Sequence, residues 1–227
     1  MVTFLRASVG RKVVVALSGL FLVVFLAVHL VVNLTLLAGA ETYNSAAHWM
    51  GTTPAILAMR PVLALGFLVH ILLSVALFVR NRTVRPVRYA MVDPAGGSTF
   101  AARNMILLGV VLVLFLALHL SSFWLRLTFG EPDMTVVGGI QMKDAYSLVA
   151  ARFALWWYVA LYVVALVALG LHLAHGVSSA IQTLGLQNER WRQRWLWVGR
   201  VTATVVVLGF AVLPITFFVQ AQMSGAP

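Results

Sequence analysis

Five long apolar runs, separated by shorter segments that hold most of the charged residues, divide the sequence. The runs lie at about Val13–Leu37, Ile56–Val79, Met105–Leu127, Phe153–Ser178 and Leu196–Phe218. Each is long enough to cross the ~30 Å hydrocarbon layer of a membrane as a helix, and lipid offers no hydrogen-bond partners to an open strand edge. The pattern predicts an all-α integral membrane protein with five transmembrane helices in a single domain, residues 1–227.

The first run has flanks that imitate a secretory signal peptide. It follows Arg11 and Lys12 and ends at the small residues 38–40, which resemble a cleavage site. However, the run is about twice as long as the apolar part of a signal peptide. It also contains His29 and Asn33, which a discarded segment has no reason to carry. We therefore interpret this run as the first transmembrane helix.

Composition agrees with a membrane protein and restricts the chemistry of any site. Of the 227 residues, 62% are hydrophobic and 10% are charged, whereas soluble domains carry about 25% charged residues. The mean hydropathy is +0.97. The absence of cysteine excludes disulfides, iron–sulfur clusters held by this chain and covalent haem attachment through cysteine. A cofactor would be held by histidine, by oxygen ligands or by packing.

The distribution of charge predicts the orientation of the chain. The 16 Lys+Arg against 6 Asp+Glu indicate basic loops at a membrane surface rather than nucleic-acid binding. The N-terminus and the second and fourth loops carry Arg6, Arg11, Lys12, Arg80, Arg82, Arg85, Arg88, Arg103, Arg190, Arg192, Arg194 and Arg200. The opposite side has Arg60, Arg126, Lys143 and Arg152. Cytoplasmic loops are the more basic, so the N-terminus is expected in the cytoplasm and the C-terminus outside. A short interfacial helix is expected in the first outer loop, around Tyr43–Met50.

Each of the first four runs contains a histidine deep inside it: His29, His70, His119 and His172. An ionisable residue at membrane depth is costly and indicates a function, although a single histidine could also hydrogen-bond a neighbouring helix. By the 1.5 Å rise per residue, His29 and His119 lie roughly 4–7 Å to the outer side of their span midpoints. His70 and His172 lie roughly 3–8 Å to the inner side. The sequence therefore predicts two pairs at two depths.

Two facing imidazoles can occupy both axial positions of a haem iron. Such ligation leaves no open coordination position, so it suits electron transfer rather than oxygen chemistry. We therefore expect two b-type haems, an outer one held by the first pair and an inner one held by the second. His175 is the alternative inner ligand, but its depth matches His70 less well. Several glycines could admit a porphyrin or could serve helix packing: Gly19, Gly66, Gly109, Gly170 and Gly176.

Two segments resemble parts of a known protein family. Ser18 to Asn33, SGLFLVVFLAVHLVVN, resembles the first helix of the cytochrome b subunit of succinate dehydrogenases and fumarate reductases. Gly170 to Gly185, GLHLAHGVSSAIQTLG, is similar to that family's fourth ligand helix, including the spacing of histidine, three residues and glycine. The likeness covers nearly the whole chain and is closest to the single-chain, two-haem bacterial type.

This resemblance implies a membrane-anchor subunit without catalytic activity of its own. Such a subunit binds a flavoprotein and an iron–sulfur protein at the cytoplasmic face of the bacterial cell membrane. Electrons from succinate pass through the inner haem and then the outer haem to a quinone, for which menaquinone is the expected species. Some members run in reverse as quinol:fumarate reductases. The resemblance implies the same four histidine ligands, in the same pairs, as their depths predict.

The resemblance also bears on two single positions. Arg152, expected to open the fourth span, corresponds to an arginine that binds a propionate of the outer haem; the alternative is an interfacial arginine that marks the helix end. Gly170 stands where a related fumarate reductase has a glutamate tied to proton movement. Proton conduction through that position is therefore not expected here.

The quinone is expected to react at the outer end, where Glu41, His48 and Arg60 are close in sequence. Glu41 and His48 are the candidates for handling protons because both can titrate with modest help from their surroundings. Lys143, Asp144 and Arg152 would approach the same region from the third loop. A rival site lies at the inner end, near His175, Ser178 and Gln182. Solvated loop residues are the alternative interpretation of the outer group.

Four other classes of membrane protein are alternatives to this interpretation. A cytochrome b561-like reductase also pairs histidines across four helices, but it has six spans and works without cytoplasmic partner subunits. The cytochrome b of the bc1 complex is excluded because it repeats two histidines within one helix. A proton or ion transporter is disfavoured because the spans hold almost no acidic partners for the histidines. A haem-free structural anchor remains the fourth possibility.

Overall fold

A computed structural model describes residues 7–84 and 99–224. Arg6, Arg85 and Arg88, which were assigned to the cytoplasmic side, lie outside this range. Within these two ranges, five helical spans are long and apolar enough to cross a membrane, in agreement with a multi-pass, predominantly helical membrane protein. They are α2 (Ser8–Leu34) with η1 (Thr35–Ala38), α4 (Pro54–Val84), α6 (Met105–His119) with η2 (Leu120–Trp124) and α7 (Leu125–Phe129), α9 (Trp156–Thr183), and α10 (Glu189–Met223).

The helices extend beyond the expected spans at most of their ends. The fifth span was expected at 196–218, whereas α10 has 35 residues and is therefore about 52 Å long. A bilayer core of ~30 Å accounts for about 20 of these residues. Hydropathy locates the part of a helix that lies in lipid. Charged residues such as Arg82 and Arg192 continue the helix into the headgroup layer, because Arg is a good helix former.

The fourth span begins later than the sequence analysis expected, at Trp156 instead of Phe153. Arg152 does not open that span, because it lies in the last turn of a separate helix, α8 (Ala145–Phe153). The chain leaves helical geometry at Leu155, and α9 begins at Trp156. Arg152 therefore stands before the break and is partly buried.

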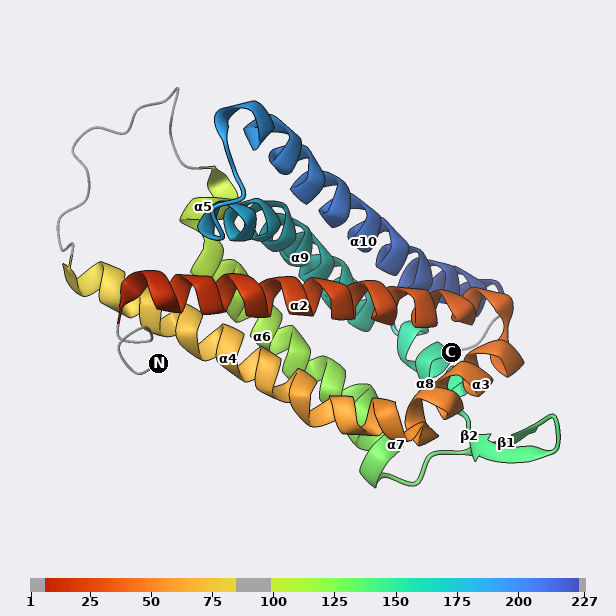
Figure 1. Ribbon diagram of the computed structural model, residues 1–227. Helices are drawn as coiled ribbons and strands as arrows, with labels where there is room; N and C mark the ends of the chain where they lie inside the picture. Colours follow the sequence, from red (N-terminus) through yellow and green to blue (C-terminus); the bar gives the residue numbers. More distant parts are fainter. Residues whose placement is uncertain (1–6, 85–98, 225–227) are drawn as a thin grey trace.

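Helices α2 and α9 pack against each other and hold the remaining spans together (Figure 1). Helix α4 packs on α2, α6 packs on α9, and α10 packs on both central helices, most extensively on α9. Contact between α4 and α6 is slight. Contacts through α2 and α9 therefore connect the first four spans, and α10 lies alongside these two helices.

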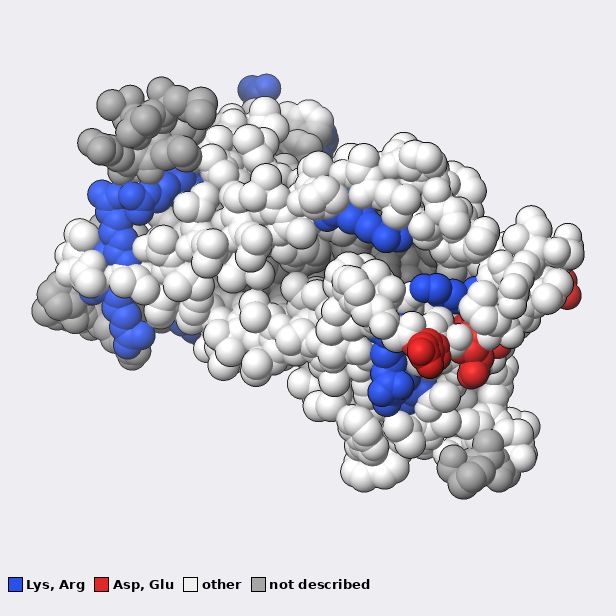
Figure 2. Space-filling model, turned by 90° about the horizontal axis from the view of Figure 1, so that it is seen from below, with Lys and Arg blue, Asp and Glu red and all other residues white. Residues whose placement is uncertain are grey.

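The two ends of this assembly differ. At one end, α2 and α10 begin and α4 and α9 finish, beside the short helix α5 (Phe100–Arg103) (Figure 1). We call it the basic end, because its described cations are Arg11, Lys12, Arg80, Arg82, Arg103, Arg190, Arg192, Arg194 and Arg200. On the face drawn in Figure 2, Lys and Arg gather there, whereas Asp and Glu gather at the opposite end together with other cations.

The opposite end, called the hairpin end, is built from segments between the spans. Helix α3 (Ala40–Thr52) confirms the expected interfacial helix and extends it at both sides. Strands β1 (Met134–Val137) and β2 (Ile140–Lys143) form an antiparallel hairpin, which the sequence analysis did not anticipate. Its turn residues Gly138 and Gly139 have φ of 56° and 80°, the left-handed pair that a two-residue hairpin turn requires.

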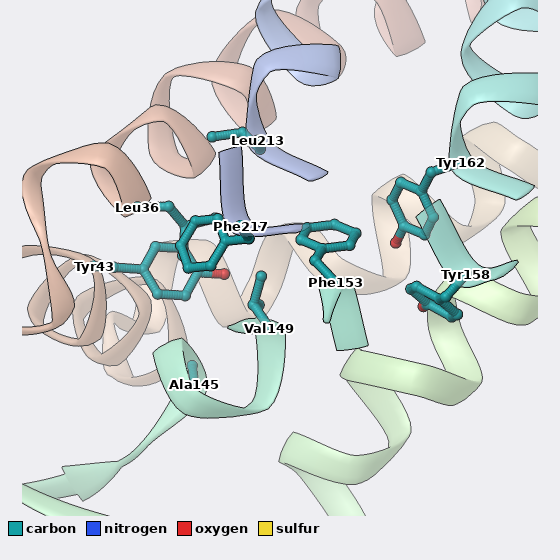
Figure 3. Close-up of a cluster of buried hydrophobic side chains, with 9 residues drawn as sticks. All are labelled: Leu36, Tyr43, Ala145, Val149, Phe153, Tyr158, Tyr162, Leu213 and Phe217. Carbon is teal, nitrogen blue, oxygen red and sulfur yellow. The ribbon is translucent and has the colours of Figure 1, made fainter. Parts of the chain in front are cut away.

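A buried cluster fastens the hairpin end to the spans (Figure 3). It unites Leu36, Tyr43, Ala145, Val149, Phe153, Tyr158, Tyr162, Leu213 and Phe217. These side chains come from η1, α3, α8, α9 and α10, so the cluster joins three transmembrane segments to the two interfacial helices. Burial raises the pKa of the Tyr43 hydroxyl to about 12. The hydroxyl therefore remains neutral at physiological pH.

Candidate functional site

The four span histidines meet in the two pairs that their depths predict. The ring centroids of His29 and His119 are 5.8 Å apart, with the planes at 86°. Those of His70 and His172 are 6.2 Å apart, with the planes at 70°. The pairing of the first span with the third, and of the second with the fourth, is therefore confirmed.

The pairs lie at two well-separated levels. On α2, Gly19 adjoins the ring of His70, and His29 follows ten residues later. On α9, Tyr162 contacts His119, and His172 also follows ten residues later. Ten residues of helix correspond to about 15 Å, so two independent helices give the same separation. This is about half of the ~30 Å hydrocarbon layer.

The surroundings of His70 determine which of its ring nitrogens carries the proton. His70 Nδ1 lies 3.3 Å from the Val15 carbonyl oxygen and 3.3 Å from Ser18 Oγ. Ser18 donates its own hydroxyl proton to Val15 O, at 3.1 Å. A carbonyl oxygen can only accept, so Nδ1 is the protonated nitrogen and Nε2 keeps its lone pair. This is the tautomer that binds a metal through Nε2.

Gly19 makes this approach of α2 to His70 possible. A Cβ atom at position 19 would lie 3.1 Å from Cε1 and 3.4 Å from Nδ1 of the His70 ring. The other glycines considered in the sequence serve different contacts. A Cβ at Gly66 would meet Phe21, a Cβ at Gly170 would meet Val207, and the space at Gly109 is open. Gly19 is thus the described glycine whose missing side chain adjoins a paired histidine.

His119 of the other pair has a tyrosine partner. Its Nδ1 lies 2.9 Å from the hydroxyl oxygen of Tyr162, a side chain only 8% exposed. Phe115 and Phe123 flank the same imidazole at centroid distances of 5.8 and 5.4 Å. The ring is therefore held by one polar contact within an aromatic wall. Tyr162 was not anticipated, because the sequence does not show which side of the fourth span faces His119.

The two remaining rings are placed differently. Phe25 stacks on His29 at a centroid distance of 5.3 Å, and Phe210 of α10 packs at 5.6 Å. Asn33 donates to the His29 carbonyl oxygen at 2.7 Å and lies 3.4 Å from its Nδ1. His172 Nδ1 is buried and has no hydrogen-bond partner among the described residues. Within that part of the chain, no hydrogen bond to these four histidines uses Nε2.

His175 does not take the place of His172. It is His172 whose ring pairs with His70, while His175 is half-buried one turn closer to the basic end. The His175 backbone carbonyl accepts a hydrogen bond from Ser178 Oγ at 3.0 Å. The geometry therefore favours His172 in the inner pair.

The donor set restricts what each pair could hold. Among residues 7–84 and 99–224, no group of three or more His, Asp or Glu side chains could hold a metal ion. A bare zinc ion normally takes three or four protein ligands. Two imidazoles suffice for an iron whose other four positions are filled by a porphyrin. With metal–nitrogen bonds of about 2 Å, and about 1 Å from each nitrogen to its ring centre, such ligation separates the centroids by about 6 Å.

The proposed quinone residues are at the hairpin end but are not joined to one another. Glu41 and Arg60 are exposed, and His48 is partly buried. Glu41 and His48 share α3 but stand seven residues apart, which is about 10 Å along the axis. No hydrogen bond or ion pair among the described residues links the three side chains. Their part in a quinone site stays a prediction.

Asp144, expected near the same site, has a structural role. It caps the first turn of α8, accepting from Ser147 N at 3.0 Å and Ser147 Oγ at 2.6 Å. It also accepts from Asn44 Nδ2 at 2.9 Å. Burial raises the pKa of the Asp144 carboxyl, but the hydrogen bonds outweigh burial and the pKa falls below its ordinary value. Nearby, Lys143 Nζ donates to the Leu127 carbonyl oxygen.

Comparison with known proteins identified no relative of this chain. The chain matches no protein-family model, no curated protein and no solved structure.

Proposed function

We propose that the two histidine pairs each bind one b-type haem, so that the first four spans form a haem-binding four-helix bundle. The observation that carries this proposal is the centroid separation of 5.8 and 6.2 Å within two pairs on four different helices. Two neutral imidazoles on either side of an iron require this spacing. The proton on His70 Nδ1, which leaves Nε2 free, supports the same conclusion.

A bound haem of this kind supplies a one-electron carrier. The residues of the chain supply the rest. His29 and His119 would hold the outer group and His70 and His172 the inner group. A haem held by two imidazoles would carry electrons rather than bind oxygen. Phe25, Phe115, Phe123 and Phe210 pack around the outer pair and would limit the access of water to it. Arg152, at the end of α8, is the proposed cationic partner of an outer propionate.

On this basis the chain is proposed to be the membrane-anchor cytochrome b subunit of a succinate:quinone oxidoreductase in a bacterial cell membrane. The resemblance of residues 18–33 and 170–185 to that family supports this assignment. So do the five spans and the basic end, which suits cytoplasmic flavoprotein and iron–sulfur partners. The subunit would relay electrons between those partners and menaquinone. It would serve a quinol:fumarate reductase equally well in the reverse direction.

A cytochrome b561-like electron carrier is the second candidate. The paired histidines favour it to the same degree, because both classes ligate haem in this way. The number of spans favours the anchor subunit, since the b561-like class has six and the described residues of this chain form five. Copurification separates the two, because only the anchor subunit should retain flavoprotein and iron–sulfur subunits.

Haem content is the direct test of the proposal. Pyridine haemochrome analysis of the purified chain should give two haem b per chain, both six-coordinate and low-spin. His70→Ala or His172→Ala should remove the inner haem, and His29→Ala or His119→Ala the outer one. His175→Ala is the matched control and should retain both. One haem or none in the wild type, or loss caused by His175→Ala instead of His172→Ala, would overturn the assignment.

The basic end is the proposed docking surface for the partner subunits. Reversing Arg190, Arg192 and Arg194 to glutamate should release the partners from the purified complex while two haems remain in the membrane subunit. Contact with anionic lipid headgroups is the alternative role of these cations, so retained assembly and turnover would assign them to lipid instead. The equivalent reversal of Arg60 and Arg126 at the hairpin end is the control and should leave the partners bound.

Quinone reduction is proposed at the hairpin end, beside the outer haem. The double variant Glu41→Gln, His48→Gln should still allow succinate to reduce both haems, while electron transfer to quinone collapses. If quinone turnover is unchanged there but falls in Ser178→Ala or His175→Gln, the reaction takes place at the basic end.

A further inference from the structure

A shallow apolar groove lies between α9 and α10, away from the histidine pairs. Its volume is about 340 Å³. It is lined by Leu166, Val167, Gly170, Leu171 and Ala174 of α9 and by Arg200, Ala203, Thr204, Val207 and Leu208 of α10. Small residues form much of the wall, and the apolar side chains of Val167 and Leu208, which also line it, are exposed. In a bilayer this surface faces lipid.

Arg200 is the one cation among the groove-lining residues, and it stands at the end nearer the basic end. It lies one turn inside the span expected at 196–218, and no described acidic side chain pairs with it. Its guanidinium carbon is 5.6 Å from the centre of the Trp197 ring, three residues towards the basic end. The side chain therefore extends towards the headgroup layer, as a charged residue at membrane depth does.

The polar groups of the groove occur in a definite order. Thr204 follows Arg200 by four residues, about 6 Å deeper into the bilayer along α10. Beyond Thr204 the walls are wholly apolar as far as Leu166 and Leu208. From Arg200 to Leu208 the groove extends about 12 Å. This order matches the order of groups in a phospholipid. The cation would bind the phosphate, the hydroxyl one turn deeper would bind a glycerol ester, and the apolar channel would hold an acyl chain.

We propose that this groove binds one anionic phospholipid, with its phosphate on Arg200, an ester carbonyl accepting from Thr204 and an acyl chain along α9 and α10. Arg is suited to phosphate because its guanidinium offers a planar fork of donors. Trp197 completes the headgroup contact, since indole rings prefer the membrane interface. This proposal does not depend on haem binding. It gives α10, which carries no histidine, a function besides packing.

Native mass spectrometry of the full chain, released from nanodiscs that contain equal amounts of dioleoyl phosphatidylglycerol and dioleoyl phosphatidylcholine, tests the proposal. The wild type should retain one phosphatidylglycerol per chain, in preference to phosphatidylcholine by about tenfold. Arg200→Gln should abolish the preference, and Thr204→Phe, which fills the channel, should abolish retention of either lipid. Arg190→Gln and Val205→Phe are the matched controls for charge and bulk, and both should behave as the wild type.

Several outcomes would overturn this assignment. Equal retention of the two lipids by the wild type would remove the role of Arg200 in selecting an anion. Loss of preference in Arg190→Gln to the same degree would make the effect one of general surface charge. A bound quinone in place of lipid, or a second chain that covers the groove, would assign it to another occupant. Circular dichroism of Thr204→Phe distinguishes loss of lipid from loss of folding.

Discussion

At the scale of single residues, the two buried tyrosines of α9 differ in what their hydroxyls contact. Tyr162 Oη lies 2.9 Å from His119 Nδ1, whereas the Tyr158 hydroxyl, one turn away in a side chain 1% exposed, has no described hydrogen-bond partner. If His119 ligates iron through Nε2, its Nδ1–H donates to Tyr162. Such a contact increases the basicity of the ligand and stabilises the oxidised iron.

We therefore expect Tyr162→Phe to raise the midpoint potential of the outer haem, with both haems still bound. A tenfold change in the reduction equilibrium corresponds to about 59 mV for one electron, and the shift should be of this order or less. A redox titration followed in the visible spectrum measures it. Tyr158→Phe is the control and should leave both potentials unchanged. Equal potentials in all three proteins would deny Tyr162 any influence on the ligand.

The histidines could be predicted from sequence because depth in a membrane helix follows directly from residue number. The helical rise per residue assigns His29 and His119 to one depth and His70 and His172 to another, without knowledge of the neighbouring helices. The identity of second partners could not be predicted in this way. Whether Tyr162 faces His119 depends on the rotation of α9 about its axis, which packing against α6 and α10 determines.

At the scale of elements, the approach of α2 to α4 depends on the missing side chain at Gly19. Valine at this position would place branched carbon atoms within the space occupied by the His70 ring, since even a Cβ lies 3.1 Å from Cε1. We expect Gly19→Val to lower the haem content from two towards one per chain, with the inner haem lost. Gly109→Val, where no atom lies within 4 Å of an added Cβ, should retain two. Unchanged haem content in Gly19→Val would show that His70 can move aside freely.

A second contact between elements joins α3 to α8. Asn44 is 2% exposed, donates to Asp144 at 2.9 Å and accepts from Tyr146 N at 2.9 Å. Asn44→Ala leaves the Tyr146 N–H without this partner and should lower the unfolding free energy by about 1–3 kcal/mol. Thermal unfolding in detergent measures the loss. Ser45→Ala, at the exposed neighbouring position, should be close to neutral.

The same contact predicts a pH dependence. The pKa of Asp144 is lower in the folded protein than its ordinary value. At a pH between the folded and the unfolded pKa, the unfolded chain therefore binds more protons than the folded chain. The stabilisation is complete above an unfolded pKa of about 3.9 and is lost as the pH falls through the folded pKa. Asp144→Asn should remove this acid-side loss. An unchanged acid transition in that variant would assign the loss to other carboxylates.

The elements of the hairpin end were only partly predictable. Helix α3 follows from its composition, whereas the hairpin was missed even though Gly138-Gly139 between short alternating runs is a signal for it. The break between α8 and α9 has no comparable signal, because residues 153–156 are apolar on both sides of it. The hydropathy pattern therefore predicts one continuous helix here. The cluster around Phe153 and Tyr158 instead stabilises two separate helices on either side of Leu155.

At the scale of the whole molecule, the two ends should face opposite sides of the membrane. The excess of cations predicts that the basic end faces the cytoplasm. The chain has no cysteine, so single introduced cysteines report their own accessibility without background. Gln193 on α10 and Gln141 on β2 are both exposed, and they stand at the basic end and the hairpin end respectively. They form a matched pair of substitutions in which no charge is changed.

We expect a membrane-impermeant maleimide to label Gln141→Cys in spheroplasts and to label Gln193→Cys only after the cells are lysed. The physical reason is the positive-inside rule, which retains loops rich in Lys and Arg in the cytoplasm. Labelling of both cysteines after lysis is the control for reactivity. The reverse pattern would place the basic end outside the cell. Cytoplasmic partner subunits could not then reach Arg190, Arg192 and Arg194, and electrons would have to enter the bundle through the His29–His119 pair.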